Sequence, residues 1–164
     1  MPDEQDYIAV AAEHQKRKLE QKYLLHIGLF LITFLTTTIA GAEWTTGRIG
    51  EFHNWQYYLV GLPYSFAILF VITCHEFGHY FAAKYHRVVA TLPYYIPFPP
   101  IPIFLNFGTM GAVIRTKSIV PNRNAMFDIG AAGPIAGFIA CLIVLVYGFL
   151  NVPGTDYILK IHPD

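Results

Sequence analysis

Charged residues are scarce in this chain, and cysteine is scarcer still. Only 13% of its 164 residues are charged and 54% are hydrophobic, whereas about a quarter of the residues in soluble proteins are charged. This balance excludes an ordinary soluble domain and indicates a membrane protein. The net charge is zero, with no basic stripe among aromatic residues, so nucleic acid is not an expected partner. Cys74 and Cys141 lie in separate apolar runs, which excludes a disulfide framework and a sulfur-rich zinc site.

Long apolar runs predict an α-helical multi-pass membrane protein with three transmembrane helices. Residues 23–41, 58–84 and 126–150 each supply about the twenty residues that cross a hydrocarbon core. Pro63 interrupts the second run, and we expect it to kink that helix rather than end it. A membrane-embedded core is therefore predicted over residues 23–150. Polar tails flank it at residues 1–22, which are either solvated or partly an interfacial helix, and at residues 151–164.

The segment between the second and third spans, residues 91–124, has a different character. Its first part is rich in proline yet almost entirely apolar, so it must be extended or looped rather than helical. Residues 107–114 are suited to a strand, with Gly108 and Gly111 at bends or close backbone contacts. We predict a membrane-associated, partly β segment, either a strand or a hairpin.

The distribution of basic residues predicts the orientation of the chain. Cationic residues are concentrated before the first span and between the second and third, against only Arg48 and Lys160 on the other side. The positive-inside rule then places the amino terminus in the cytoplasm. The concentrated residues are Lys16, Arg17, Lys18, Lys22, Lys84, Arg87, Arg115, Lys117 and Arg123. The expected location is a bacterial cytoplasmic membrane.

The second span carries a metal-binding pattern, His75-Glu76-Phe77-Gly78-His79. Residues four apart share one face of a helix, so His75 and His79 can bind one Zn²⁺ while Glu76 acts as a general base on water. A catalytic zinc site uses three protein ligands and leaves the fourth position to water. An alternative is that these polar residues lie at a helix end and only face water.

The depth of the motif weighs against that alternative. His75 lies nine residues before Lys84, or roughly 13 Å along a helix. If Lys84 marks the membrane surface, the motif lies within the bilayer, where polar side chains are costly and seldom present without a function.

Together with two later segments, the motif resembles the site-2 protease family of intramembrane zinc metalloproteases. The resemblance covers about residues 65–150. The two segments are Asn106-Phe107-Gly108-Thr109-Met110-Gly111-Ala112-Val113-Ile114 and Phe127-Asp128-Ile129-Gly130-Ala131-Ala132-Gly133-Pro134-Ile135-Ala136-Gly137.

The resemblance implies zinc-dependent cleavage of a transmembrane protein substrate within the lipid bilayer, with His75 and His79 as ligands and Glu76 as base. It also implies that an exposed strand edge pairs with unwound substrate, which makes sense physically because a helical substrate hides its peptide bonds. Simple packing is the alternative role for this strand. The candidate edge residues are Gly108, Thr109, Met110, Gly111, Ala112 and Val113. The sequence indicates nothing about oligomeric state.

Small residues spaced along the third span, including Gly130, Gly133 and Gly137, predict close packing against the motif helix. For Asp128, near the start of this span, helix capping is preferred over metal binding.

The chain departs from the family pattern at the third metal ligand, an Asp that the family supplies from a later span. After Leu150 the carboxylates are Asp156 and Asp164, which the predicted topology places a membrane thickness away from His75. One hypothesis is that the chain is an incomplete catalytic core, inactive alone, of a longer protease. The other is a non-catalytic membrane scaffold or regulatory pseudoprotease, although a scaffold has no need of Glu76.

Overall fold

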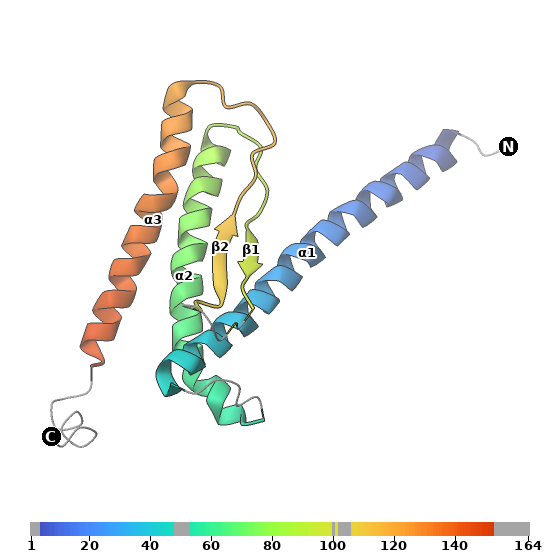
Figure 1. Cartoon of the computed structure of the whole chain (residues 1–164). Coiled ribbons are helices and arrows are strands. Elements are labelled where there is room, and N and C mark those ends of the chain that lie inside the picture. Colours follow the sequence, from blue (N-terminus) through green and yellow to red (C-terminus); the bar gives the residue numbers. More distant parts are fainter. Residues whose placement is uncertain (1–3, 48–52, 100, 102–105, 153–164) are drawn as a thin grey trace, which may run out of the picture.

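The computed structural model describes the backbone of residues 4–47, 53–99, 101 and 106–152, with side chains from Lys22 onward within these ranges. This part of the chain forms α1 (Glu4–Thr46), α2 (Trp55–Tyr85), β1 (Tyr94–Pro97), β2 (Thr109–Val113) and α3 (Arg123–Leu150). The helices α2 and α3 lie side by side, α1 crosses obliquely near the start of α2, and the strands lie between α1 and α2 (Figure 1).

The prediction of three long apolar helices is confirmed. Each helix contains a segment long and apolar enough to cross a membrane, namely Lys22–Thr46, Trp55–Tyr85 and Arg123–Leu150. Large apolar side chains point outward from all three, as at Leu31, Phe66 and Phe138, and lipid rather than water is the solvent that suits such a surface. The helix α1 also continues toward Glu4, so the backbone of the predicted amino-terminal tail is helical.

Pro63 behaves as predicted. The helix α2 runs through it without ending, and the first turns of α2 run at an angle to the rest (Figure 1). A proline cannot donate a backbone hydrogen bond and its ring crowds the preceding turn, so a bend at this point is expected.

The predicted strand is confirmed as β2, which pairs with β1 in a two-stranded antiparallel sheet. Tyr94 is opposite Val113 and Tyr95 is opposite Ala112, and an irregularity follows between Tyr95 and Pro97. A two-stranded ribbon is marginal by itself. Here ring contacts with α1 hold it, among them a 5.0 Å centroid separation between Phe30 and Tyr95. Within the proline-rich part, residues 100 and 102–105 lie outside the described residues.

A group of hydrogen bonds, here termed the clasp, ties the start of β2 to α1. Its members are Thr36, Glu43, Trp44, Asn106 and Gly108. Trp44 Nε1 donates to the Asn106 carbonyl at 2.7 Å and Thr36 Oγ1 donates to the Gly108 carbonyl at 2.6 Å. The Asn106 side chain donates to Glu43 and accepts from the Gly108 amide. Gly108 has a φ of +73°, which favours glycine.

The helices α1 and α2 pack closely against each other. A Cβ atom added at Gly61 would collide with the Thr38 carbonyl oxygen and lie 2.7 Å from the Ala42 nitrogen. Nearby, the hydroxyl groups of Thr37 and Ser65 are hydrogen-bonded at 2.7 Å and buried. Small and hydroxylated residues therefore let the two backbones approach, the usual basis of helix packing in membranes.

The capping prediction for Asp128 is wrong. The cap of α3 is Asn122, whose side-chain oxygen accepts a 2.8 Å hydrogen bond from the Ala125 amide. The helix begins earlier than the apolar run because Asn122 supplies this acceptor. Asp128 lies beyond the first turn, and its carboxylate is 2.8 Å from His86 Nε2 at the end of α2.

Candidate active site

The helix α2 presents the three motif residues together. The Nε2 atoms of His75 and His79 are 3.2 Å apart, and the two rings are nearly perpendicular, at 79°. The Glu76 side chain is only 7% exposed. Because the residues occupy successive turns of one helix, the arrangement needs no distortion of the backbone.

The histidine pair fits a zinc ion. Zinc binds histidine nitrogen at about 2.0–2.1 Å in a tetrahedral shell, which sets two ligating nitrogens roughly 3.3 Å apart. The distance between the Nε2 atoms of His75 and His79, 3.2 Å, agrees with this spacing. Two basic nitrogens facing each other this closely also need a cation or a shared proton between them.

The helix α3 fixes the orientation of His79. Its Nδ1 lies 2.6 Å from the carbonyl oxygen of Ile129. A carbonyl can only accept, so Nδ1 carries the hydrogen and Nε2 keeps its lone pair for a metal. The sequence did not identify Ile129, because its contribution is a backbone carbonyl that every residue possesses.

The small face of α3 makes room for both rings. A Cβ atom at Gly133 would collide with the His79 ring, and one at Gly137 would lie 3.0 Å from His75 Nδ1. The predicted packing of small residues against the motif helix is confirmed at these two positions. Gly130 is different, since a Cβ there would meet nothing within 4 Å.

Glu76 faces a cavity of about 300 Å³ at the carboxyl end of β2. The cavity is also lined by His79 and by residues from β2 and its continuation, including Val113, Ile114 and Thr116. The backbone of Ile114 is within hydrogen-bonding reach of the Glu76 carboxyl group. The strand β2 thus ends beside Glu76, the candidate base. An extended peptide at this point could contact both β2 and Glu76.

The other five strand candidates do not line this cavity. Gly108 belongs to the clasp, and Thr109 is buried, with its hydroxyl donating to the Ile96 carbonyl at 2.9 Å. Met110 is 71% exposed, while Gly111 and Ala112 are half-buried in the strand. Of the six, the structure brings Val113 into the same cavity as Glu76 and His79.

A tyrosine that the sequence did not single out lies beside the motif. The hydroxyl groups of Tyr95 in β1 and Thr73 in α2 are 2.7 Å apart. Burial raises the pKa of the Tyr95 hydroxyl above its ordinary value, while the hydrogen bond with Thr73 acts in the opposite direction. This bond joins the sheet to α2 half a turn before His75.

A third metal ligand is not found in the part of the chain that the structure describes. Within those residues no three His, Cys, Asp or Glu side chains gather where they could hold one ion. The side chain of Asp128, the alternative metal-binding candidate, contacts His86 instead. Asp156 and Asp164 lie outside the described residues.

Comparison with known proteins places this geometry in context. The model of a family described as Peptidase family M50 matches residues 63–160. "Probable zinc metalloprotease EGY1, chloroplastic" of Oryza sativa subsp. japonica is 37% identical over 105 residues, which are 61% of this chain and 17% of that protein. "Probable zinc metalloprotease EGY2, chloroplastic" of Arabidopsis thaliana is 34% identical over 108 residues, or 66% and 18%. The chain thus spans about a fifth or less of these relatives' length. No solved structure gives a significant match.

Proposed function

Because the chain belongs to peptidase family M50, the site-2 protease family, we propose that it carries the catalytic core of a zinc-dependent intramembrane endopeptidase. The observation that supports this most strongly is the pair of Nε2 atoms of His75 and His79, 3.2 Å apart. They lie beside the buried Glu76 on a helix apolar enough to span a membrane.

In this proposal His75 and His79 hold the metal through Nε2, and Ile129 keeps His79 in the tautomer that leaves Nε2 free. Bound zinc would supply a Lewis acid that polarises the peptide carbonyl and makes water more acidic. Glu76 takes the proton of the attacking water and returns it to the leaving amine. Its burial restricts the contact of the carboxyl group with water to the cavity that it lines.

The third ligand is proposed to come from outside the described residues, so the described part by itself would not form a complete zinc site. Two observations support this. The described residues offer two of the three ligands that a catalytic zinc site uses. The relatives named as zinc metalloproteases are about five times longer or more than the segment they share with this chain.

The substrate is proposed to be a transmembrane protein whose helix unwinds and pairs with β2. Over Gly108 to Val113 an added strand would hold an extended backbone toward Glu76 by main-chain hydrogen bonds. The support is that β2 pairs with β1 along one edge and ends at the cavity that Glu76 lines. Gly108 and Thr109 would anchor this edge, since both are already bonded within the protein.

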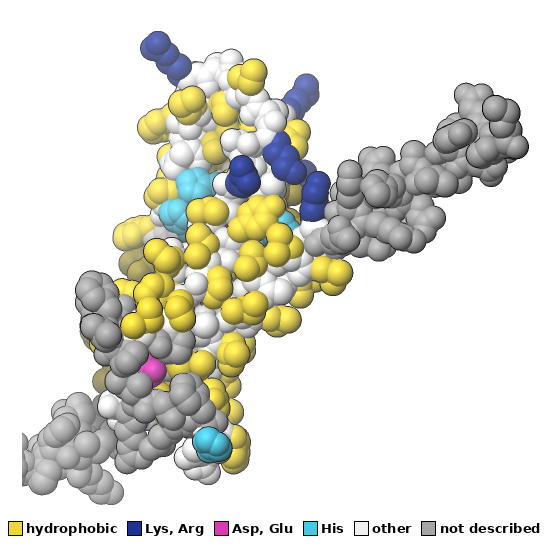
Figure 2. Space-filling model, turned by 45° about the vertical axis from the view of Figure 1, so that its right-hand side comes forward, with side chains coloured by type: hydrophobic (Ala, Val, Ile, Leu, Met, Phe, Trp, Pro, Cys, Tyr) yellow, Lys and Arg dark blue, Asp and Glu magenta, His cyan; other side chains and the backbone are white. Residues whose placement is uncertain are grey.

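The amino terminus and the segment between α2 and α3 are proposed to face the cytoplasm. The support is the concentration of Lys and Arg at the end of the molecule where α2 ends and α3 begins (Figure 2). The expected bacterial location stays a prediction, and the plant relatives are named as chloroplastic.

The test is cleavage of a model transmembrane substrate by the purified full-length gene product. Glu76→Gln should keep zinc binding and lose at least about 100-fold in activity, because the amide cannot accept the proton. Asp128→Asn is the matched control, since it removes a carboxylate on the neighbouring helix that contacts His86 instead, and it should retain activity.

Two results would count against the proposal. If Glu76→Gln remains as active as the unmodified enzyme, Glu76 is not the base. If the full-length protein binds zinc stoichiometrically yet cleaves no substrate, a non-catalytic scaffold is the better explanation.

A further inference from the structure

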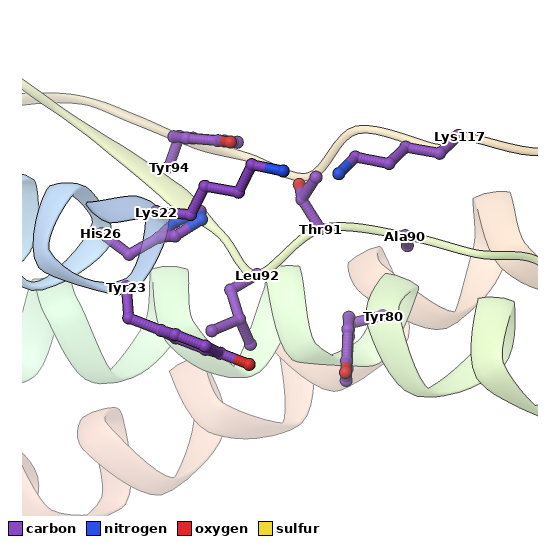
Figure 3. A pocket seen from close by; sticks show the side chains of 9 residues that line it. All are labelled: Lys22, Tyr23, His26, Tyr80, Ala90, Thr91, Leu92, Tyr94 and Lys117. Atoms are coloured by element: carbon purple, nitrogen blue, oxygen red, sulfur yellow. The ribbon is translucent and has the colours of Figure 1, made fainter. Parts of the chain in front are cut away.

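A second cavity, of about 190 Å³, lies next to α1 and shares none of its lining residues with the catalytic cavity. It is formed where α1, α2 and the segments flanking the sheet meet (Figure 3). The side chains that matter for its chemistry are Lys22, Tyr23, His26, Tyr80, Thr91 and Lys117.

Two ammonium groups converge on this cavity. Lys22 comes from α1 and Lys117 from the segment after β2, and they reach toward Thr91 from opposite sides (Figure 3). The lining contains no carboxylate, and neither lysine has an ion-pair partner among the side chains that the structure describes. Both lysines are exposed, and two like charges that line one hollow repel each other, so the site favours an anion that contacts both.

Polar groups at the cavity are arranged to complete such a contact. The Thr91 hydroxyl accepts a 3.0 Å hydrogen bond from the Arg115 amide, which leaves its own hydrogen to donate. A hydroxyl donor and two ammonium groups match the oxygens of a phosphate.

The position of the cavity suggests where that phosphate would come from. Lys22 is the last charged residue before the apolar run that begins at Tyr23, and such a change of composition is expected where hydrocarbon gives way to lipid headgroups. Exposed apolar side chains continue along α1 from there, including Leu24 at 67% and Ile27 at 55% exposure. Acyl chains could lie along this surface, whereas an acidic soluble peptide would gain nothing from it.

We propose that this cavity binds a phosphate group, supplied in the membrane by the headgroup of an anionic phospholipid. Basic pockets between transmembrane helices are suited to such headgroups. A cavity of about 190 Å³ far exceeds the roughly 10–15 Å³ that one water needs, so a phosphodiester fits. This site is separate from the catalytic one and does not depend on proteolytic activity.

The experiment uses the whole chain in neutral detergent micelles, titrated with dioleoylphosphatidylglycerol or dioleoylphosphatidylcholine and followed by native mass spectrometry. One phosphatidylglycerol per chain should bind in preference to phosphatidylcholine. Each lysine near an anionic surface strengthens binding roughly fivefold, so Lys22→Gln/Lys117→Gln should weaken it by about 25-fold. Helix content from circular dichroism confirms that the variant is folded.

A charge-matched variant serves as the control. Lys84→Gln/Arg123→Gln removes two exposed positive charges at the same end of the molecule but outside the cavity lining. It should keep the preference for phosphatidylglycerol. Equal weakening in both double variants, or no preference between the two lipids, would overturn the proposal.

Two competition arms identify the source of the anion. Inorganic phosphate that displaces the lipid only at millimolar concentration supports a headgroup site. Displacement at micromolar concentration would show a site for free phosphate and overturn the lipid assignment. Displacement by a tetraglutamate peptide at micromolar concentration would instead assign the cavity to acidic protein segments and overturn the phosphate site.

Discussion

The contacts on the two sides of α2 are both close, but they are made by different groups. Against α1, the backbones touch, because Gly61 faces the carbonyl of Thr38. Against α3, the backbones also touch, at Gly78 and the carbonyl of Ala132, but there Gly133 and Gly137 face the imidazole rings of His79 and His75 as well. The backbone contacts set how near the helices lie. The contacts with the rings set where two side chains point.

This difference teaches that glycines at helix contacts can have different roles. Where the neighbour is backbone, an added methyl group forces whole helices apart. Where the neighbour is the far end of a side chain, the ring can rotate away at little cost in stability, but it then leaves its place in the site. Stability and metal binding should therefore respond to different glycines.

The largest expected effect is on zinc affinity. Gly133→Ala places a methyl group against the His79 ring, which must rotate and lose the bond to Ile129. Zinc affinity of the full-length protein should fall roughly 100-fold, measured by competition with a chromogenic chelator, while thermal stability without metal changes little. Gly130→Ala, on an open face of the same helix, should leave zinc affinity unchanged. Equal losses of zinc affinity in both variants would show that the contact between Gly133 and the His79 ring does not set the position of that ring.

The next effect is on stability at the α1 contact. Gly61→Ala should lower the free energy of unfolding by about 1–3 kcal/mol because the backbone of α1 cannot move aside locally. Unfolding in detergent, followed by fluorescence, gives the value. Gly28→Ala in α1 meets nothing within 4 Å, and it should be neutral or stabilise by about 0.5–1 kcal/mol. If both alanines have the same effect, the backbone contact at Gly61 is not what limits the packing.

A smaller and more local effect is expected at the clasp. Asn106→Ala removes the bonds to Glu43 and to the Gly108 amide, which should cost about 1–2 kcal/mol. Amide hydrogen exchange should accelerate in β2 more than in α3. Asn124→Ala, an exposed position in α3, serves as the control and should leave β2 unaffected. Uniform acceleration across the chain would mean that the clasp supports the whole fold rather than the strand.

The smallest effect is expected for the contact between the side chains of His86, just after α2, and Asp128 in α3. His86 and Asp128 are joined at 2.8 Å, but the Asp128 side chain is 53% exposed. Asp128→Asn should therefore cost only about 0.2–1 kcal/mol, and less in high salt. A loss as large as that of Gly61→Ala would show that surface charge, and not close glycine contacts, holds these helices together.

The apolar runs and the motif were sufficient to predict the three spans, the strand at Thr109–Val113 and the meeting of small residues in α3 with the motif helix. These features depend on side-chain patterns along one element. The contributions that sequence reasoning missed are made by backbone groups across elements, as with the Ile129 carbonyl. The role of Asn122 was also missed, because the apolar run that marked the third span begins after the helix does.

The bond between His79 and Ile129 has a consequence for how variants of α3 should be interpreted. This helix contributes no metal ligand of its own in the described residues, and its small residues predicted only close packing against the motif helix. Yet it determines which nitrogen of His79 bears the hydrogen. A change anywhere in α3 that slides or rotates the helix should therefore lower zinc affinity in a well-folded protein whose motif is untouched. Zinc affinity would then depend on α3 as well as on the two histidines.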